Sequence, residues 1–171
     1  MMDVVRTSLG WSLCVRPARR EDANAVERLG ARVFDPESAI AMRNAVLEHG
    51  LPTTAESKSV AATYYLAAET EGAPLVGMIG FFRLRWIGPQ NGFLGWFAVE
   101  PEHQRAGVGT ALLEFLLNRL PSLQVRHLLV ETSGEGSSAV RFYERNGFVR
   151  VSTIDDYWHD GSALLLYRRT L

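Results

Sequence analysis

Two glycines separated by one residue occur where an apolar, strand-like run (residues 94–99) gives way to a helix-like run (residues 111–119). Such a loop suits phosphate groups, because the first N–H groups of the helix have no partner within it and the helix dipole adds positive charge there. Glycine also lets the backbone turn sharply and lets a ligand approach it closely. The sequence therefore predicts a phosphate-binding loop made of Gln104, Arg105, Ala106, Gly107, Val108, Gly109 and Thr110.

Three phosphate-binding patterns can be compared with this loop. The P-loop pattern, Gly-x4-Gly-Lys-Ser/Thr, does not occur in the chain. The dinucleotide-binding pattern, Gly-x-Gly-x-x-Gly/Ala, fails at the loop because Leu112 occupies its third position. Residues 134–139 do match it, and Asp155 and Asp156 follow about 20 residues later, but too little chain follows to complete a doubly wound domain. The third pattern, Gln-x-x-Gly-x-Gly, matches the loop itself.

The strands and helices that must position the loop are predicted from hydrophobic periodicity. Strands are expected over residues 13–15, 63–68, 75–86, 92–99, 125–131, 148–154 and 163–169. Helices are expected after Asp22, with Val26, Leu29 and Val33 at helical spacing, over residues 36–49 and 107–119, and from residue 137 or 138 to residue 146. Short turns make the strands between residues 63 and 99 antiparallel, whereas the strand–helix–strand unit around the loop predicts a parallel pair. The expected fold is α/β, with a mixed, mostly antiparallel sheet of about seven strands.

Two further details of the first helices are predicted from residue type. Asp22 is a favourable N-cap for the first helix. The second helix is expected to turn Ile40, Val46 and Leu47 toward the core.

Length, composition and charge set the broad class of the protein. With 171 residues, 47% hydrophobic and 22% charged, the chain is typical of one soluble domain, here residues 12–171 after an N-terminal extension over residues 1–11. The net charge of -1 gives no general attraction to nucleic acid or membrane, so neither is expected as a partner. Cys14 is the only cysteine and no apolar run is long enough to cross a bilayer, so a cytoplasmic protein is expected. The four histidines lack metal-site spacing, and no metal is expected.

The glycine loop and two other segments resemble the GCN5-related N-acetyltransferase (GNAT) superfamily, whose fingerprint is Gln/Arg-x-x-Gly-x-Gly/Ala. Residues 15–18, Val-Arg-Pro-Ala, are similar to the family's first strand and turn, and residues 97–109 are similar to its central strand and loop. Downstream, residues 142–148, Phe-Tyr-Glu-Arg-Asn-Gly-Phe, also resemble the family. The resemblance implies a GNAT-like sheet whose central parallel strands splay apart, with helices on both faces.

By this resemblance the cosubstrate is acetyl-CoA, and no metal takes part. Backbone N–H groups of residues 105–110 would bind its pyrophosphate. The pantetheine arm would pair with the strand before the loop, at Phe97, Ala98 and Val99. An N–H near Val99 would polarise the acetyl carbonyl, which is an oxyanion-hole role. Many relatives have an Asn before the final helix that contacts CoA; here Ser138, or Ser137 beside it, would take that place or would only cap the helix.

Transfer to an amine needs two proton movements, because the ammonium must lose a proton before it attacks and the departing thiolate is better released as a thiol. Tyr143 matches the family's usual proton donor to the thiolate, although a tyrosine can also simply pack with its hydroxyl satisfied by backbone. Glu131 lies twelve residues earlier, the spacing found in ribosomal-protein N-terminal acetyltransferases. The resemblance implies that Glu131 is a general base, directly or through a water; the alternative is a solvated charge at a strand end.

Together these resemblances imply an N-acetyltransferase that moves the acetyl group of acetyl-CoA to a primary amine by direct attack in a ternary complex. The acceptor would be a small-molecule amine, a peptide N-terminus or a lysine, and relatives often form homodimers. The loop over residues 155–161, with two aromatics and three acids, either borders the acceptor site and favours a cationic amine or is a plain hairpin turn. Two other classes stay open: a non-catalytic acyl-CoA sensor of the same fold, and a nucleotide-binding module that uses residues 134–139.

Overall fold

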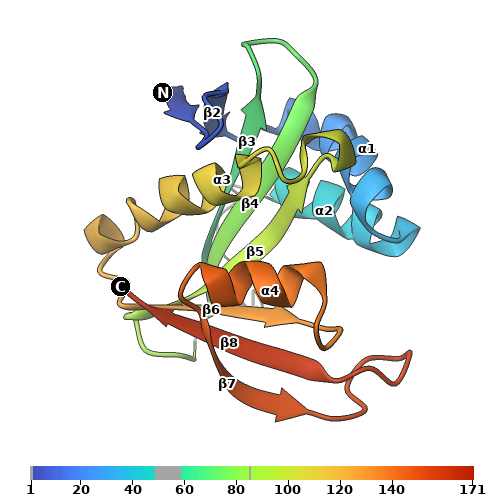
Figure 1. Ribbon diagram of the computed structural model, residues 1–171, viewed down its shortest axis with the longest axis vertical. Helices are drawn as coiled ribbons and strands as arrows, with labels where there is room; N and C mark the ends of the chain where they lie inside the picture. Colours follow the sequence, from blue (N-terminus) through green and yellow to red (C-terminus); the bar gives the residue numbers. More distant parts are fainter. Residues whose placement is uncertain (1, 49–58, 85) are drawn as a thin grey trace.

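The computed structural model describes residues 2–48, 59–84 and 86–171 (Figure 1). Within this part of the chain, eight strands form a single sheet. The strands are β1 (Asp3–Arg6), β2 (Ser12–Pro17), β3 (Ser59–Ala68), β4 (Leu75–Leu84), β5 (Asn91–Val99), β6 (His127–Thr132), β7 (Val149–Ile154) and β8 (Leu164–Thr170). The α-helices are α1 (Ala23–Val33), α2 (Pro36–Glu48), α3 (Val108–Leu117) and α4 (Ser138–Arg145). Short 3₁₀ helices are η1 (Arg20–Asp22), η2 (Pro101–His103) and η3 (Pro121–Leu123).

The sheet has the strand order β1-β2-β3-β4-β5-β6-β8-β7. Every neighbouring pair is antiparallel except β5 and β6, which α3 connects. The predicted mixed, mostly antiparallel sheet with one parallel pair at the glycine loop is confirmed. The strand beyond the seven predicted is β1, which lies in the segment expected to be an extension and pairs with β2 from Asp3↔Val15 to Arg6↔Ser12. Four residues with a charge at each end carry too little apolar alternation to predict a strand.

Helices cover both faces of the sheet, as predicted: α1 and α2 lie behind it in Figure 1, and α3 and α4 lie in front. Because strand residues alternate between the two sides, each face has its own hydrophobic core. Leu112 and Tyr143 belong to the core under α3 and α4, whereas Leu29 and Met42 belong to the core under α1 and α2. The position of a residue along β5 or β6 therefore decides which pair of helices it faces.

The contact between α1 and α2 corrects one prediction. Gly30 lets the two helices approach so closely that a Cβ atom there would lie 2.9 Å from the Ala39 Cα atom. This approach turns Ala39, Met42 and Val46 toward the core, so that Val46 is buried as predicted. The prediction for Ile40 is wrong, because its side chain is 46% exposed. Apolar residues are spread around α2, and the close approach at Gly30 decides which of them lie inside.

Asp22 directly precedes α1 as predicted, but its side chain does not cap the helix. Its carboxylate instead accepts two hydrogen bonds of 2.7 Å from the Arg16 guanidinium and one of 2.7 Å from the Arg19 backbone N–H. Burial alone would raise the pKa of the Asp22 carboxyl, but these hydrogen bonds lower it below its usual value. The charge on Asp22 therefore ties the start of α1 to β2.

Asp22→Asn should destabilise the protein, because the amide cannot accept both guanidinium hydrogen bonds and leaves Arg16 without its counter-charge. We expect the free energy of unfolding in urea to fall by about 1–3 kcal/mol at neutral pH. Because the pKa of Asp22 is lowered by folding, its contribution is present above the unfolded-state pKa and disappears as the pH falls through the folded-state pKa. The difference between variant and wild type should therefore shrink in acid.

Glu21→Gln is the matched control, since the Glu21 side chain is 72% exposed and lies 3.5 Å from Arg19 in a loose surface pair. Equal stability of the Asp22 and Glu21 variants would contradict the role assigned to Asp22.

Candidate functional site

The parallel strands β5 and β6 separate soon after they begin. They pair over residues 91–93 of β5 and 127–129 of β6. Beyond this point β5 continues to Val99 beside β4, whereas β6 continues beside β8. The edge of β5 that faced β6 is therefore left without a strand partner over residues 94–99.

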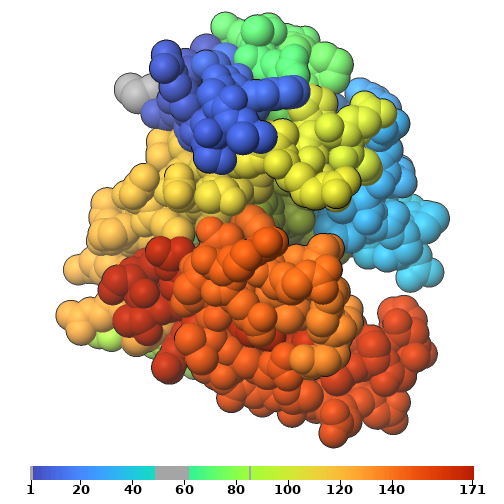
Figure 2. Space-filling view, in the orientation of Figure 1, coloured from blue at the N-terminus to red at the C-terminus, as the bar shows by residue number. Residues whose placement is uncertain are grey.

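A β-bulge in β5 lies where the two strands part. Ile79 and Phe81 on β4 pair with Phe97 and Leu94, so three steps along β5 correspond to two along β4. The extra residue bends the bulged strand and increases its twist, which turns β5 away from β6. This is the predicted splay of the parallel pair. Figure 2 shows the surface hollowed between α3 and α4 over this region.

The glycine loop begins where β5 ends and leads into α3. Arg105 and Gly107 have φ angles of 62° and 83°, both in the left-handed region. The first backbone hydrogen bond of the helix runs from the Ala111 N–H to the Gly107 carbonyl at 3.0 Å. The N–H groups of residues 108–110 have no partner among the residues that the structure describes. The loop thus has free donors at the positive end of a helix dipole, as a phosphate-binding site requires.

Side chains on both sides hold this loop in place. Gln104 Nε2 donates a hydrogen bond to the Val99 carbonyl at 3.1 Å, which ties the loop to the end of β5. Val108 is fully buried in the core under α3, and Ala106 packs against the same core. With these side chains turned inward, the loop leaves its backbone available to a ligand.

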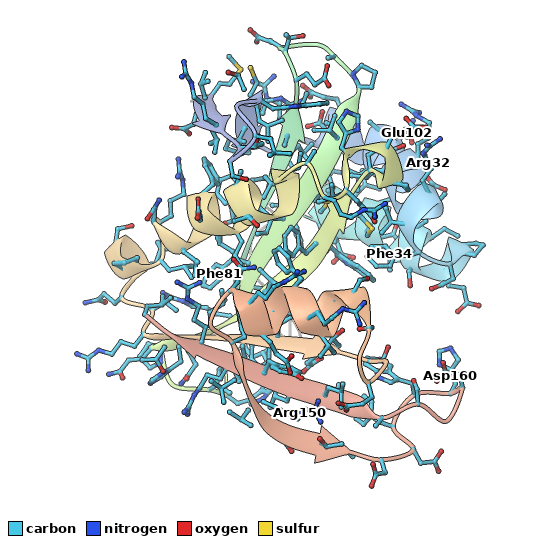
Figure 3. All side chains as sticks on the ribbon, in the orientation of Figure 1. Arg32, Phe34, Phe81, Glu102, Arg150 and Asp160 are labelled. Carbon is cyan, nitrogen blue, oxygen red and sulfur yellow. The ribbon has the colours of Figure 1, made fainter. Side chains whose placement is uncertain are left out.

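The segment that enters the loop is also tied to α1. Arg32 pairs with Glu100 and, at 3.1 Å, with Glu102 (Figure 3). The Glu100 N–H donates to the Val76 carbonyl on β4 at 2.9 Å. Sequence periodicity predicted none of these contacts, because Arg32 is 70 residues from Glu102 in the chain and an exposed charge on a helix carries no pairing signal.

Tyr143 lies on α4 in an aromatic cluster that reaches the free part of β5. Its ring centroid is 5.6 Å from that of Phe142 and 5.5 Å from that of Phe148, and Phe142 lies 5.6 Å from Phe97. Burial raises the pKa of the Tyr143 hydroxyl far above its usual value. No described residue forms a hydrogen bond with this hydroxyl. The hydroxyl therefore stays protonated, and its proton is free for a ligand or water.

Two serines lie at the start of α4, and one of them caps the helix. Ser137 is the N-cap, since its Oγ accepts a hydrogen bond from the Val140 N–H at 3.2 Å. Ser138 is the exposed first residue of the helix, and its contact with CoA stays a prediction. Gly147, with a φ of 79°, follows the helix as expected of a C-terminal glycine.

A buried tyrosine hydroxyl fixes α4 against β8. Tyr167 donates to Glu144 Oε1 at 3.0 Å and accepts from Arg150 Nε at 3.1 Å and Nη2 at 3.0 Å. Arg150, labelled in Figure 3, also donates to Glu135 at 2.5 Å. These hydrogen bonds join α4, β7, β8 and the segment before α4, and so fix the helix that carries Tyr143.

Glu131 lies on β6 beyond the last pairing with β5. Its neighbours Leu128 and Val130 belong to the core under α3 and α4, so Glu131 faces the opposite side of the sheet. The Glu131 side chain is exposed, yet partial desolvation raises the pKa of its carboxyl. Tyr143 and Glu131 thus approach the parting of β5 and β6 from opposite faces of the sheet.

The loop between β7 and β8 has the backbone of a hairpin turn. The N–H groups of Tyr157 and Trp158 donate to the Ser162 carbonyl at 3.2 and 3.0 Å, and Asp160 accepts hydrogen bonds from the Ser162 N–H and hydroxyl. Figure 3 shows Asp160 at the tip of this loop. A role in acceptor binding stays a hypothesis.

Cys14 lies apart from this site. It is half-buried and lines a cavity of about 540 Å³ between β2, α1 and the turn from β3 to β4. Across the described ranges, His, Cys, Asp and Glu side chains form no group of three that could hold a metal ion. The helices within those ranges are too short or too polar to span a membrane.

Comparison with known proteins decides the family. Residues 34–148, which include the glycine loop, Glu131 and Tyr143, match the family model described as "Acetyltransferase (GNAT) family". The chain belongs to the GNAT acetyltransferase family. The resemblance recognised in the sequence is therefore confirmed, and acetyl-CoA is the acetyl donor that this family uses.

Several proteins resemble this GNAT chain over all or part of its length. It is 28% identical over 147 residues to the S-(2-succino)cysteine N-acetyltransferase of Bacillus subtilis (strain 168), covering 82% of this chain and 86% of that protein. It is 36% identical over 61 residues to the ribosomal protein bS18-alanine N-acetyltransferase of Escherichia coli (strain K12), covering 36% of this chain and 41% of that protein. A solved GNAT-family structure from Desulfovibrio desulfuricans matches with a TM-score of 0.78 at 26% identity, covering 92% of this chain and 98% of that one.

The GNAT fold does not fit the dinucleotide-binding alternative. Residues 134–139 form the turn and first residues of the short helix α4, as the pattern requires. A dinucleotide site, however, also requires parallel strands on both sides of the helix. Here β8 lies between β6 and β7 and is antiparallel to both, so the strands before and after α4 do not form the adjacent parallel pair of a dinucleotide-binding unit.

Gly107→Ala should impair cosubstrate binding. The substitution strains a φ of 83° and places a Cβ atom 2.8 Å from Ser8 Oγ, so the loop must shift. Gly72→Ala is the control, because Gly72 has a φ of 82° in the turn between β3 and β4 and its Cβ atom would meet nothing within 4 Å. Both variants should lose about 1 kcal/mol of stability. Only Gly107→Ala should weaken acetyl-CoA binding, by about tenfold or more in calorimetry; equal affinity in the two variants would contradict a role for the loop.

Proposed function

We propose that this GNAT protein transfers the acetyl group of acetyl-CoA to a primary amine, by direct attack of the amine within a ternary complex. The observation that carries the proposal is the buried Tyr143 side chain, whose hydroxyl is protonated and forms no hydrogen bond with a described residue. A sensor that only bound acyl-CoA would need the glycine loop but would not need an unused proton donor on α4. This observation therefore favours the enzyme over the sensor.

The glycine loop and β5 supply the contacts proposed for acetyl-CoA. The free N–H groups of residues 108–110, together with Arg105, would bind the pyrophosphate. The pantetheine arm would run along the unpaired edge of β5, at Phe97, Ala98 and Val99. This arm carries amide groups of its own, which can pair with a strand edge as another strand would. The acetyl carbonyl would then lie where an N–H near Val99 can polarise it.

Tyr143 and Glu131 lie on opposite faces of the sheet, and each would carry out one of the two proton transfers. The amine nitrogen attacks the carbonyl carbon, and the bond between that carbon and the CoA sulfur breaks. Tyr143, on the α4 face, would donate its proton to the departing thiolate. Glu131, on the opposite face, would take the proton that the amine must lose, directly or through a water. Acid and base therefore act from opposite sides of the opening between β5 and β6.

A small-molecule amine is the acceptor we favour. The relative that matches 82% of this chain is named for a small-molecule acceptor, S-(2-succino)cysteine, whereas the relative named for a ribosomal protein matches 36% of it. A peptide N-terminus or a lysine is the alternative, and a screen of both acceptor classes for release of CoA separates them. The homodimer and the cytoplasmic location stay predictions.

Tyr143→Phe should abolish most of the turnover while leaving cosubstrate binding intact, because it removes the donated proton and keeps the aromatic ring. We expect kcat to fall by about 10²-fold or more and the Kd for acetyl-CoA to stay within about twofold. Tyr65→Phe is the control, since Tyr65 packs against the same core through Phe115. An unchanged kcat in Tyr143→Phe would remove Tyr143 from the chemistry.

Glu131→Gln should change the dependence of kcat/KM on pH. A general base works only when deprotonated, so activity should decline as the pH falls through the pKa of Glu131. Because desolvation raises that pKa, the decline should begin at a higher pH than for an exposed glutamate. Glu131→Gln should lower kcat/KM and lose this acidic limb, whereas Glu114→Gln on the exposed side of α3 should keep it. If kcat/KM depended on pH identically in the wild type and in Glu131→Gln, Glu131 would not be the base, and water would take that role.

A further inference from the structure

The N-terminal hairpin contains a tight turn, residues 7–11, between β1 and β2. The Thr7 N–H donates to the Trp11 carbonyl at 2.8 Å, and the Thr7 carbonyl accepts from the Gly10 N–H at 2.9 Å. Thr7 Oγ1 also accepts from the Trp11 N–H at 3.1 Å, and Thr7 is only 5% exposed. These internal hydrogen bonds fix the backbone of the turn. Its side chains therefore have defined positions and restrain the residues that they contact.

The turn contacts the phosphate-binding loop and the segment that leads into it. At Gly107, a Cβ atom would lie 2.8 Å from Ser8 Oγ and 3.2 Å from the Thr7 Cβ, so turn and loop touch. At His103, the Trp11 ring stands edge-on with a centroid distance of 5.6 Å. Figure 2 shows the dark-blue hairpin directly against the yellow segment that leads into α3.

The hairpin and its contacts are fastened to the rest of the molecule. Asp3 on β1 pairs with Arg119, just beyond α3, at 2.8 Å. His103 Nε2 lies 3.1 Å from the Glu69 carboxylate, just beyond β3. The hairpin therefore contacts the phosphate-binding loop before α3 and pairs with Arg119 just after α3. It lies outside residues 34–148, the segment that matches the GNAT family model.

We propose that this turn positions the phosphate-binding loop, so that Trp11 and Ser8 set the affinity for acyl-CoA; the inference rests on the proposed function. Arg105 and Gly107 both have left-handed backbone conformations, which for Arg105 is unfavourable. Such a conformation persists only where its surroundings hold it. A loop that is held before the cosubstrate arrives loses less conformational entropy on binding, which raises affinity. Trp11 and Ser8 are positioning residues, since they act through the loop and not on the reacting atoms.

Trp11→Ala tests this proposal, with Trp11→Phe as the conservative variant and Leu9→Ala as the control. Leu9 lies in the same turn and is 65% exposed. We expect Trp11→Ala to raise the Kd and the KM for acetyl-CoA by about threefold to tenfold, and to leave kcat and the KM for the acceptor unchanged. Trp11→Phe should restore most of the affinity because it keeps an aromatic edge against His103. Ser8→Val, which adds bulk beside Gly107, should weaken binding independently of Trp11.

Hydrogen exchange of the protein without cosubstrate gives a readout that does not depend on activity. The Ala106 and Ala111 amides, which bond to the His103 and Gly107 carbonyls, should exchange faster in Trp11→Ala and not in Leu9→Ala. Unchanged exchange and unchanged Kd in both Trp11→Ala and Ser8→Val would overturn the proposal. A wild type that binds no acetyl-CoA would instead overturn the proposed function, and the exchange rates would still test the hairpin.

Discussion

The separation of β5 from β6 is the constraint on which the rest of the site depends. Backbone donors and acceptors at a strand edge inside a sheet are unfavourable unless something pairs with them. Here the pairing ends after three residues on each strand, at the point where β5 carries an extra residue relative to β4. The glycine loop begins where the unpaired edge ends, and α4 packs beside it. An unpaired strand edge followed by a phosphate-binding loop fits an extended ligand with amide groups and an anionic end better than it fits a compact ligand.

Aromatic packing connects the free strand to the proton donor. Phe97 on β5 meets Phe142 on α4, and Phe142 meets Tyr143, so the side chain that would deliver a proton is held by the strand that would bind the cosubstrate. On the other side of α4, the Tyr167 hydroxyl bonds to Glu144 and Arg150. The helix is therefore fixed from both sides, so the protein itself holds Tyr143 in position before a ligand binds.

Local features of this protein were predictable from sequence, and contacts between distant segments were not. The glycines of the loop and the serine cap of α4 depend on backbone conformations that a few neighbouring residues determine, and the structure agrees with them. Asp22 was expected to cap α1 but pairs with Arg16, because a nearby guanidinium competes with the helix for the same carboxylate. Ile40 was expected inside but is exposed, because a glycine on another helix sets the packing. Trp11 gives no signal in the sequence for its contact with His103.

The two faces of the sheet separate the proposed cosubstrate site from the proposed general base. We assign the glycine loop, α4 and Tyr143 to the cosubstrate; like Glu131, they lie within the segment that matches the GNAT family. Glu131 faces the other side, where α1 and α2 pack on the sheet. An amine that reaches Glu131 must therefore approach past residues that the cosubstrate does not constrain. Family membership accordingly predicts the acetyl donor, while under our proposal the choice of acceptor depends on this second face, where Val46 of α2 is buried as predicted and Ile40 is not.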